Sequence, residues 1–347
     1  MMRNTEIRQR TQVTDSNAVM DMAYSGGTEL AASLSENAVC IMDTFSCVVH
    51  QKHCIDSPVK GLAYVGPVLN FVDERGYVHQ VDHRDVAKPS CTRLSFPTPD
   101  ISTTAAAFND NYIAVATVGQ TYEGTDPDSD EEGSNVYSTV WLYDVRNTNK
   151  VLSVVDTESH SDTVNALAFR NELLLSGGED GIVNVFDPAA EEDDRLLTTV
   201  QIASPVSRVG VMAESNLMYA TCDSTKWTLM RMNGPEDVDI VVNRNLARDR
   251  YVVNVVPYLE ESLPLASVEC TIDGSVYAVG CSEDGTVAEL VANWMGAHTG
   301  MVRCAQVVGG TLFTGSEDGF IAALSFDMRN LTGKATKERA KIRSTPY

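Results

Sequence analysis

Short runs of apolar and β-branched residues, separated by turns of small and polar residues, recur along the chain. In residues 172–187 the run ELLLS precedes the turn GGEDG, and the run IVNVF follows it. The Asp-Gly pair of this turn favours the positive φ that a tight hairpin connection needs. The same layout returns as SVYAVG and TVAELV around Glu283, as TLFTG and FIAAL around Glu317, and as ELAAS and AVCIM around Glu36. The pattern predicts antiparallel hairpins and an all-β fold, with each of these acidic turns joining the second and third strands of its unit.

A second marker gives the length of the repeating unit. An Asp follows an apolar residue at the end of the later strand at Asp43, Asp82, Asp144 and Asp187. The first two lie 39 residues apart and the last two 43, close to the ~40 to 45 residues of one four-stranded propeller blade. The longer middle interval contains an acidic insertion, residues 119–135. We therefore expect a single-domain, seven-bladed β-propeller with blades at 19–51, 59–96, 101–156, 158–202, 205–242, 251–292 and 298–327.

Two units carry a family resemblance. The stretches SHSDTVNALAF and LLLSGGEDGIVNVFD, and the later AHTGMVRCAQV and LFTGSEDGFIAAL, resemble repeats of the WD-repeat family. The resemblance implies hydrogen-bonded structural pairs between a loop His and a turn Asp, His160 with Asp180 and His298 with Asp318. The chain departs from the family where Phe186 replaces the usual Trp and where Leu-Ser replaces the Trp-Asp pair of the last unit.

The ends of the chain differ from the predicted propeller, residues 19–328. The last blade lacks an outermost strand, and IRQRTQV within residues 1–18 is expected to supply it. Such closure removes the exposed sheet edges of an open ring. Residues 329–347 form a basic stretch that we expect to be a flexible tail.

The charge distribution suggests the kind of partner. The formal net charge is −22, so direct nucleic-acid binding by the propeller is not expected, because phosphate binding needs clustered Lys and Arg. The acidic turns are expected to gather on one face and to attract a basic protein partner. The predicted face comprises Glu36, Glu179, Glu283 and Glu317, together with Asp128, Asp130, Glu131 and Glu132 of the insertion. The alternative interpretation is solvated charge that serves solubility.

The opposite face has its own pattern, an Asp-x-Arg sequence at the end of three third strands. It occurs as VDHR, YDVR and FDMR and comprises Asp82, Arg84, Asp144, Arg146, Asp327 and Arg329. These sequences resemble the box by which many WD-repeat proteins dock on the adaptor of cullin-RING ubiquitin ligases, although the Trp of that box is absent. An Arg fork on a rigid strand end can pair with partner carboxylates in bidentate fashion. The alternative is that each Arg pairs with an acidic neighbour of its own blade.

Other chemistry finds little support in the sequence. The chain lacks the nucleophile-elbow, phosphate-loop and zinc-protease motifs, so no enzyme and no cofactor are predicted. Cys40, Cys47, His50, His53 and Cys54 do not match a closed zinc site. The eight cysteines form no C-x-x-C pair and no window is apolar enough for a membrane helix, which predicts a cytoplasmic or nuclear protein without membrane partners.

Three functions remain open at this stage. The first is a non-catalytic scaffold whose acidic face binds a basic protein. The second is a substrate receptor of a cullin-RING ubiquitin ligase, and the third is a subunit or escort in a ribonucleoprotein or chromatin assembly.

Overall fold

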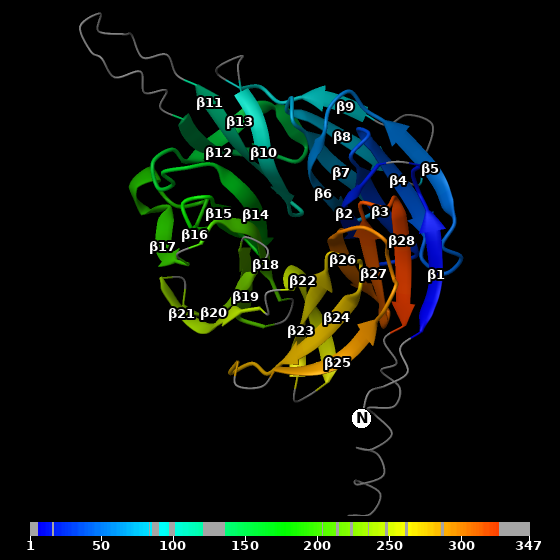
Figure 1. The fold of residues 1–347 in the computed structure, drawn as a ribbon. Helices are drawn as coiled ribbons and strands as arrows, with labels where there is room; N and C mark the ends of the chain where they lie inside the picture. Colours follow the sequence, from blue (N-terminus) through cyan, green and yellow to red (C-terminus); the bar gives the residue numbers. More distant parts are fainter. Residues whose placement is uncertain are drawn as a thin grey trace, which may run out of the picture.

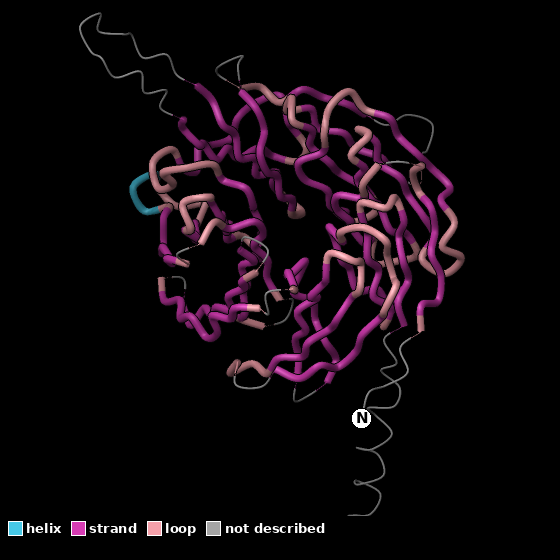
Figure 2. The backbone as a smooth tube through the Cα atoms, in the orientation of Figure 1, coloured by secondary structure: helices cyan, strands magenta, loops and turns pink. Residues whose placement is uncertain are grey.

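The computed structural model describes residues 6–15, 17–82, 84, 90–96, 101–120, 136–202, 204–212, 215–222, 225–234, 236–246, 249–260, 263–285 and 288–325. Within them, 28 strands form seven four-stranded antiparallel sheets that surround a central channel (Figure 1). This arrangement confirms the predicted seven-bladed β-propeller. The only helical element in the described part is the three-residue 3-10 helix η1 (Glu192–Asp194), visible at the rim of Figure 2. None of the described helices is therefore long enough to cross a membrane.

In blades 1 to 6 the strands follow one another outward from the channel in sequence order, and in blade 7 the first three strands do so. Blade 1 contains β2 (Val19–Tyr24), β3 (Glu29–Leu34), β4 (Ala38–Asp43) and β5 (Val49–Cys54), and blade 2 contains β6 (Val59–Val65), β7 (Val68–Asp73), β8 (Tyr77–Asp82) and β9 (Ser90–Arg93). Blade 3 contains β10 (Ile101–Phe108), β11 (Tyr112–Gln120), β12 (Val136–Asp144) and β13 (Asn147–Asp156), and blade 4 contains β14 (Val164–Arg170), β15 (Leu173–Gly178), β16 (Ile182–Phe186) and β17 (Leu196–Gln201). Blade 5 contains β18 (Val206–Val211), β19 (Leu217–Cys222), β20 (Lys226–Gly234) and β21 (Asp237–Asn245), and blade 6 contains β22 (Arg250–Glu260), β23 (Leu263–Thr271), β24 (Val276–Cys281) and β25 (Ala288–Trp294). Blade 7 contains β26 (Val302–Val308), β27 (Thr311–Ser316), β28 (Phe320–Ser325) and, as its outermost strand, β1 (Ile7–Gln12).

The N-terminal strand joins the two ends of the ring. β1 pairs antiparallel with β28, with Ile7 opposite Leu324 and Gln12 opposite Phe320. Gln9 and Thr11 of β1 also donate side-chain hydrogen bonds to backbone carbonyls of the neighbouring blade 1. Blade 7 is thereby completed by a segment from the opposite end of the described chain, and its last strand is not left as an open edge.

Strand direction gives the propeller two distinct faces. Because successive strands are antiparallel, the connections between second and third strands lie on the same face as the loops between blades. We call this the upper face. The connections between first and second strands, and between third and fourth strands, lie on the opposite face, which we call the lower face.

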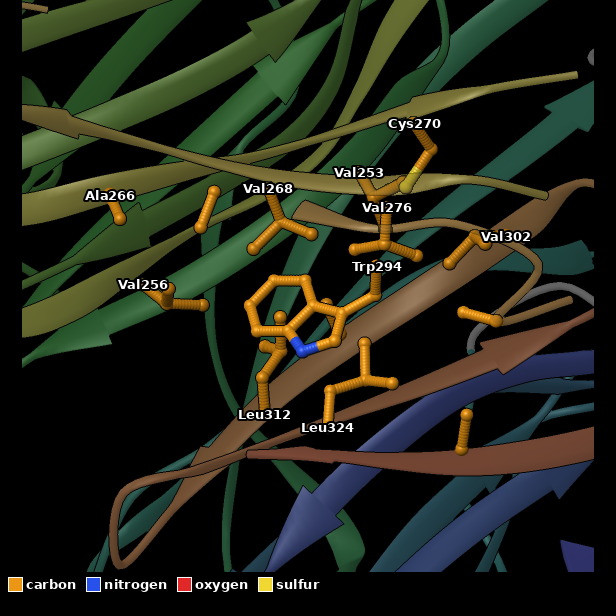
Figure 3. Packing of buried hydrophobic residues seen from close by; sticks show 14 of the residues in the cluster. Val253, Val256, Ala266, Val268, Cys270, Val276, Trp294, Val302, Leu312 and Leu324 are labelled. Atoms are coloured by element: carbon orange, nitrogen blue, oxygen red, sulfur yellow. The ribbon is translucent and has the colours of Figure 1, made fainter. Parts of the chain in front are cut away.

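Close packing between neighbouring blades forms the core. The second and third strands are apolar on both sides, since each is covered by the adjacent blades, whereas the outermost β5 alternates between half-buried and exposed residues. Each of the seven innermost strands has a register shift near its start, and β22 has a second one near its end. A β-bulge at such a position increases the local twist of the strand. Between blades 6 and 7 the fully buried Trp294 packs among Val268, Leu312 and Leu324 (Figure 3).

Glycine is required where two blades approach most closely. A Cβ at Gly177 would lie 2.5 Å from Cγ1 of Val206 in the next blade, and a Cβ at Gly315 would lie 2.5 Å from Cγ1 of Val19. Both glycines occupy the second strand, opposite the first residue of the neighbouring innermost strand. The small residues in the repeated turns therefore serve packing between blades as well as turn formation.

The strand order of blade 6 corrects one prediction from the sequence. SVYAVG and TVAELV were expected to be second and third strands, but they fall in β24 and β25, the third and fourth. The first two places are taken by β22 and β23, a long hairpin over residues 250–271. The turn that contains Glu283 therefore lies on the lower face.

Candidate functional site

Two matching hydrogen-bond networks stabilise the upper face. In blade 4 the buried His160 places Nδ1 3.0 Å from Oδ2 of Asp180 and Nε2 2.6 Å from Oγ of Ser176. The Asp180 carboxylate also accepts hydrogen bonds from the amides of Ser161 and Ile182. The network thus ties the loop that enters the blade to the hairpin turn.

Blade 7 repeats this arrangement and adds a contact to β1. Nδ1 of His298 lies 3.2 Å from Oδ1 of Asp318, whose carboxylate also accepts the amides of Thr299 and Phe320. Arg10 of β1 completes the site, with Nη2 3.1 Å from Asp318 and its guanidinium over the Phe320 ring. Burial alone would raise the pKa of Asp318, but the hydrogen bonds from His298 and Thr299 hold it well below its usual range.

Blade 2 uses a different histidine, one that the sequence gave no reason to single out. Asp73 is buried and accepts the amides of Arg75 and Tyr77, while its Oδ2 lies 3.2 Å from Nε2 of His79. The His79 ring stacks on Phe71 at 4.7 Å. Asp73 is therefore a structural carboxylate and not part of an acidic surface. A His on the third strand, six residues after a turn Asp, is the signal that could have revealed it.

The acidic residues of the upper face are largely paired with bases. Glu36 accepts Nζ of Lys52 at 2.6 Å, and Glu317 pairs with Arg303. Glu74 is likewise 3.0 Å from Nζ of Lys60. Glu179 instead accepts a hydrogen bond from the amide of Asn165. Asp128, Asp130, Glu131 and Glu132 belong to the connection between β11 and β12 and lie outside the described residues.

Glu283 does not share a face with these residues, contrary to the prediction. It belongs to the connection between β24 and β25, where Nη2 of Arg231 donates to its backbone carbonyl at 2.9 Å. The prediction was wrong because the hairpin β22–β23 shifts the Ser-Glu-Asp-Gly turn by one strand. Antiparallel strands alternate direction, so a shift of one strand places a turn on the other face.

This correction reveals a surface that the sequence reasoning missed. The connections between the third and fourth strands of blades 4, 5 and 6, together with the start of β21, carry exposed acidic residues, and we call these residues the lower acidic surface. It comprises Glu191, Glu192, Asp193, Asp194, Glu236, Asp237, Asp239, Glu283 and Asp284. The run EEDD was visible in the sequence, but only the blade assignment places it beside the turns of blades 5 and 6.

Two arginines near this surface donate to backbone carbonyls and form no ion pair with Glu191, Glu192 or Asp193. Nε of Arg195 donates to the backbone carbonyl of Ala190, and Arg231 donates to that of Glu283. Within the described chain, Glu191, Glu192 and Asp193 form no ion pair with a Lys or Arg. These three carboxylates of blade 4 therefore differ from Glu36, Glu74 and Glu317 of the upper face, each of which pairs with a Lys or Arg.

The Asp-x-Arg residues also lie on the lower face, on blades 2 and 3. Arg84 folds back on its own neighbour, with Nε 3.0 Å from Oδ1 and Nη2 2.7 Å from Oδ2 of Asp82. The exposed Arg146 donates its backbone amide to Oδ1 of Asp144 at 2.8 Å. Asp327 and Arg329 lie outside the described residues. The Arg84 fork thus already binds a carboxylate of its own blade.

The central channel contains an ion pair between distant blades. Nη1 of Arg208 in blade 5 lies 3.1 Å from Oδ1 of Asp21 in blade 1, and its Nη2 donates to the carbonyl of Arg303. Beside it, the Tyr219 hydroxyl donates to Asn254 at 2.7 Å. These polar contacts link blades across a cavity of about 660 Å³.

Metal binding and the reactivity of the Cys40 thiol receive no support from the described residues. No group of three His, Cys, Asp or Glu side chains among the described residues is arranged to hold a metal ion. Burial raises the pKa of the Cys40 thiol to about 11, which disfavours the reactive thiolate. The charged surfaces are therefore the more informative features.

Comparison with known proteins supports the fold. The family described as WD domain, G-beta repeat matches residues 150–187. This interval contains most of β13 and then β14 to β16, so the repeat in the sequence spans the outermost strand of blade 3 and the first three strands of blade 4. A chain in the structure titled "Crystal Structure of Mitotic Checkpoint Complex" superposes with a TM-score of 0.72 at 16% identity, over 93% of each chain. The protein is thus a β-propeller that contains a WD repeat.

Proposed function

We propose that the protein is a non-catalytic scaffold that binds a basic segment of a protein partner through the lower acidic surface. The observation that carries this proposal is the row of exposed carboxylates on three consecutive blades. Two arginines of these blades, Arg195 and Arg231, donate hydrogen bonds to backbone carbonyls. A surface of one sign steers an oppositely charged partner toward it and raises the association rate. The upper face is less suited, because Lys52, Lys60 and Arg303 offset its acidic turns.

The comparisons agree with a scaffold. A chain of the same fold is found in the structure titled "Crystal Structure of Mitotic Checkpoint Complex", which by its title is a complex. Propellers present many loops on two faces, and function lies in such loops rather than in the blades. This agreement concerns the class of function and leaves the partner to be identified.

The test compares two variants of equal net charge. The lower variant carries Glu191→Gln, Glu192→Gln, Asp193→Asn and Asp194→Asn, and the upper variant carries Glu36→Gln, Glu74→Gln, Glu179→Gln and Glu317→Gln. Each is used to capture partners from cell extract at about 50 mM and 300 mM salt, a range over which screening of surface charges increases strongly. Basic partners should be retained by the wild type and the upper variant at low salt and lost from the lower variant. Equal retention by both variants, or loss from the upper variant alone, would contradict the proposal.

The ubiquitin-ligase alternative has a separate test. It requires Arg84 to leave Asp82 and to pair with an adaptor carboxylate, which costs the two hydrogen bonds of the existing fork. The double substitution Arg84→Glu/Arg146→Glu should remove a cullin-RING adaptor from the captured proteins without unfolding the chain. Absence of such an adaptor from the wild-type sample would eliminate this function and leave the scaffold proposal intact.

Escort of a nucleic-acid-binding protein is the third possibility. Such partners carry exposed Lys and Arg clusters that an acidic surface can cover before assembly. In the capture experiment this function would appear as ribosomal, chromatin or other nucleic-acid-binding proteins lost specifically from the lower variant. It is thus a more detailed form of the same proposal.

A further inference from the structure

The interface between blades 5 and 6 contains a charged cluster of two bases and one acid. The Glu269 side chain on β23 is only 1% exposed. Its Oε2 lies 3.2 Å from Nη1 of Arg250, and its Oε1 lies 3.4 Å from Nη2 of Arg244. Ser267 also donates its hydroxyl to this carboxylate at 3.1 Å. Among the described residues neither arginine pairs with a second acid, so one positive charge of the cluster has no counter-charge.

The two arginines of this cluster are held differently. Arg250 donates a hydrogen bond to Glu269, and its guanidinium carbon lies 3.9 Å from the centre of the Tyr277 ring in a cation–π contact. Arg244 forms its ion pair with Glu269 through Nη2, whereas its Nη1 is buried and has no hydrogen-bond acceptor among the described residues. The charge and the donor capacity of Arg244 are therefore only partly used.

A second donor without an acceptor lies on the neighbouring strand. Trp227 of β20 is fully buried, and its indole Nε1 has no hydrogen-bond partner in the described part of the chain. Trp227 and Arg244 are opposite each other in the pairing of β20 with β21, so their side chains leave the same face of the sheet. Trp227 packs there with Leu265 and Cys281 of blade 6. Because indole and guanidinium N–H groups can only donate, both require an acceptor at this interface.

The chemistry of the missing partner follows from these groups. A buried donor without an acceptor is costly, and so is a partly buried charge without a counter-charge. A water molecule accepts hydrogen bonds but does not balance the charge. A small monovalent anion does both, and guanidinium groups form strong hydrogen bonds with anions. The side chains of Arg244 and Arg250 are 29% and 26% exposed, so the cluster is open to ions from the solvent.

We propose that a small monovalent anion such as chloride binds between Nη1 of Arg244 and Nε1 of Trp227 and joins blade 5 to blade 6. The anion balances the second guanidinium charge and accepts from both donors. It thereby fastens β21, the outermost strand of blade 5, to the sheet of blade 6. The site lies toward the upper face, where β20 and β22 begin. It uses no residue of the lower acidic surface and is independent of the proposed function.

The first test compares thermal unfolding of the full chain in sodium bromide and in sodium gluconate at the same ionic strength, about 150 mM. A ligand that binds the folded state raises the melting temperature, which should be higher in bromide by about 2 °C. Trp227→Phe, which keeps a ring without the N–H, and Arg244→Met, which leaves Glu269 paired with Arg250, should both lose this difference. The control Arg146→Met removes an exposed arginine of blade 3 and should keep it.

Bromide also locates the ion directly. In crystals of the full chain grown with sodium bromide, an anomalous peak should lie in contact with Nη1 of Arg244 and Nε1 of Trp227. Density at this point without an anomalous signal would identify a water molecule and overturn the proposal. A peak without the rise in melting temperature would mean an adventitious ion only, and an equal rise in the wild type and Arg244→Met would likewise overturn the site. If neither variant folds, the wild-type peak and its melting temperatures decide.

Discussion

Replacing the turn carboxylate of blade 7 tests the role assigned to its hydrogen-bond network. Asp318→Asn keeps the shape of the side chain but replaces one acceptor oxygen by an NH₂ group. In the wild type the two oxygens accept from His298 at 3.2 Å, Thr299 N at 2.8 Å, Phe320 N at 3.1 Å and Arg10 at 3.1 Å. If the NH₂ group takes the place of Oδ2, its N–H groups face the N–H donors of Thr299 and Arg10, which then lose their acceptor.

The expected loss follows from these contacts. A buried donor left without its acceptor costs about 1 to 3 kcal/mol, and the Arg10 pair, about a third exposed on the Arg side, adds at most about 1 kcal/mol. We expect Asp318→Asn to lower the free energy of unfolding by about 1 to 4 kcal/mol at pH 7. Asp180→Asn in blade 4 should cost less, because no arginine of the described residues contacts that carboxylate.

The pH dependence provides an independent check. Since the pKa of Asp318 is lowered in the folded state, its contribution is complete above the unfolded value of about 3.9 and is lost as the pH falls below it. The difference in unfolding free energy between wild type and Asp318→Asn should therefore be constant from about pH 7 to pH 5 and decrease below about pH 4.

Urea unfolding followed by tryptophan fluorescence measures these differences, with Asp56→Asn as the control. Asp56 is exposed, and removal of its charge should change the stability by less than about 0.5 kcal/mol. A loss in Asp318→Asn no larger than in the control would refute the reasoning. A difference that grows as the pH falls would refute the sign of the linkage.

Three further predictions concern packing, thiol chemistry and the channel. Gly177→Ala should lower the unfolding free energy by about 1 to 3 kcal/mol, because its Cβ would overlap Val206; a second change, Val206→Ala, should recover part of the loss in the same urea assay. Under native conditions a thiol reagent should modify Cys54 and Cys91 first, since the other six cysteines are buried. Cys91 should react more slowly than Cys54, because partial burial and nearby carboxylates raise the pKa of its thiol. Rapid modification of a third cysteine in peptide mapping would contradict this prediction. Arg208→Met should change the free energy of unfolding by less than about 1 kcal/mol, because the partner carboxylate of Asp21 is more than a third exposed. A larger drop in the melting temperature than for Gly177→Ala would contradict this and would show that the ion pair across the channel stabilises the fold more than its exposure indicates.

The sequence alone determined the repeating unit and hence the architecture. Alternating apolar runs and Asp-Gly turns specify hairpins because these signals are local, and a period near 40 residues specifies blades. The histidine and turn-carboxylate pairs of blades 4 and 7 were expected from the resemblance to WD repeats, and the structure contains both pairs. Two polar partners of the upper acids lie close in sequence as well: Asn165 precedes Glu179 by 14 residues, and Arg303 precedes Glu317 by 14 residues.

Only the tertiary structure decided which face each charge occupies. The hairpin β22–β23 takes the first two places of blade 6, so the turn with Glu283 falls one strand later than its repeat pattern indicates. In an antiparallel sheet every strand reverses direction, and a shift of one strand therefore moves a turn to the opposite face without changing its local sequence. The lower acidic surface results from blades that are neighbours in space, which a local pattern does not encode.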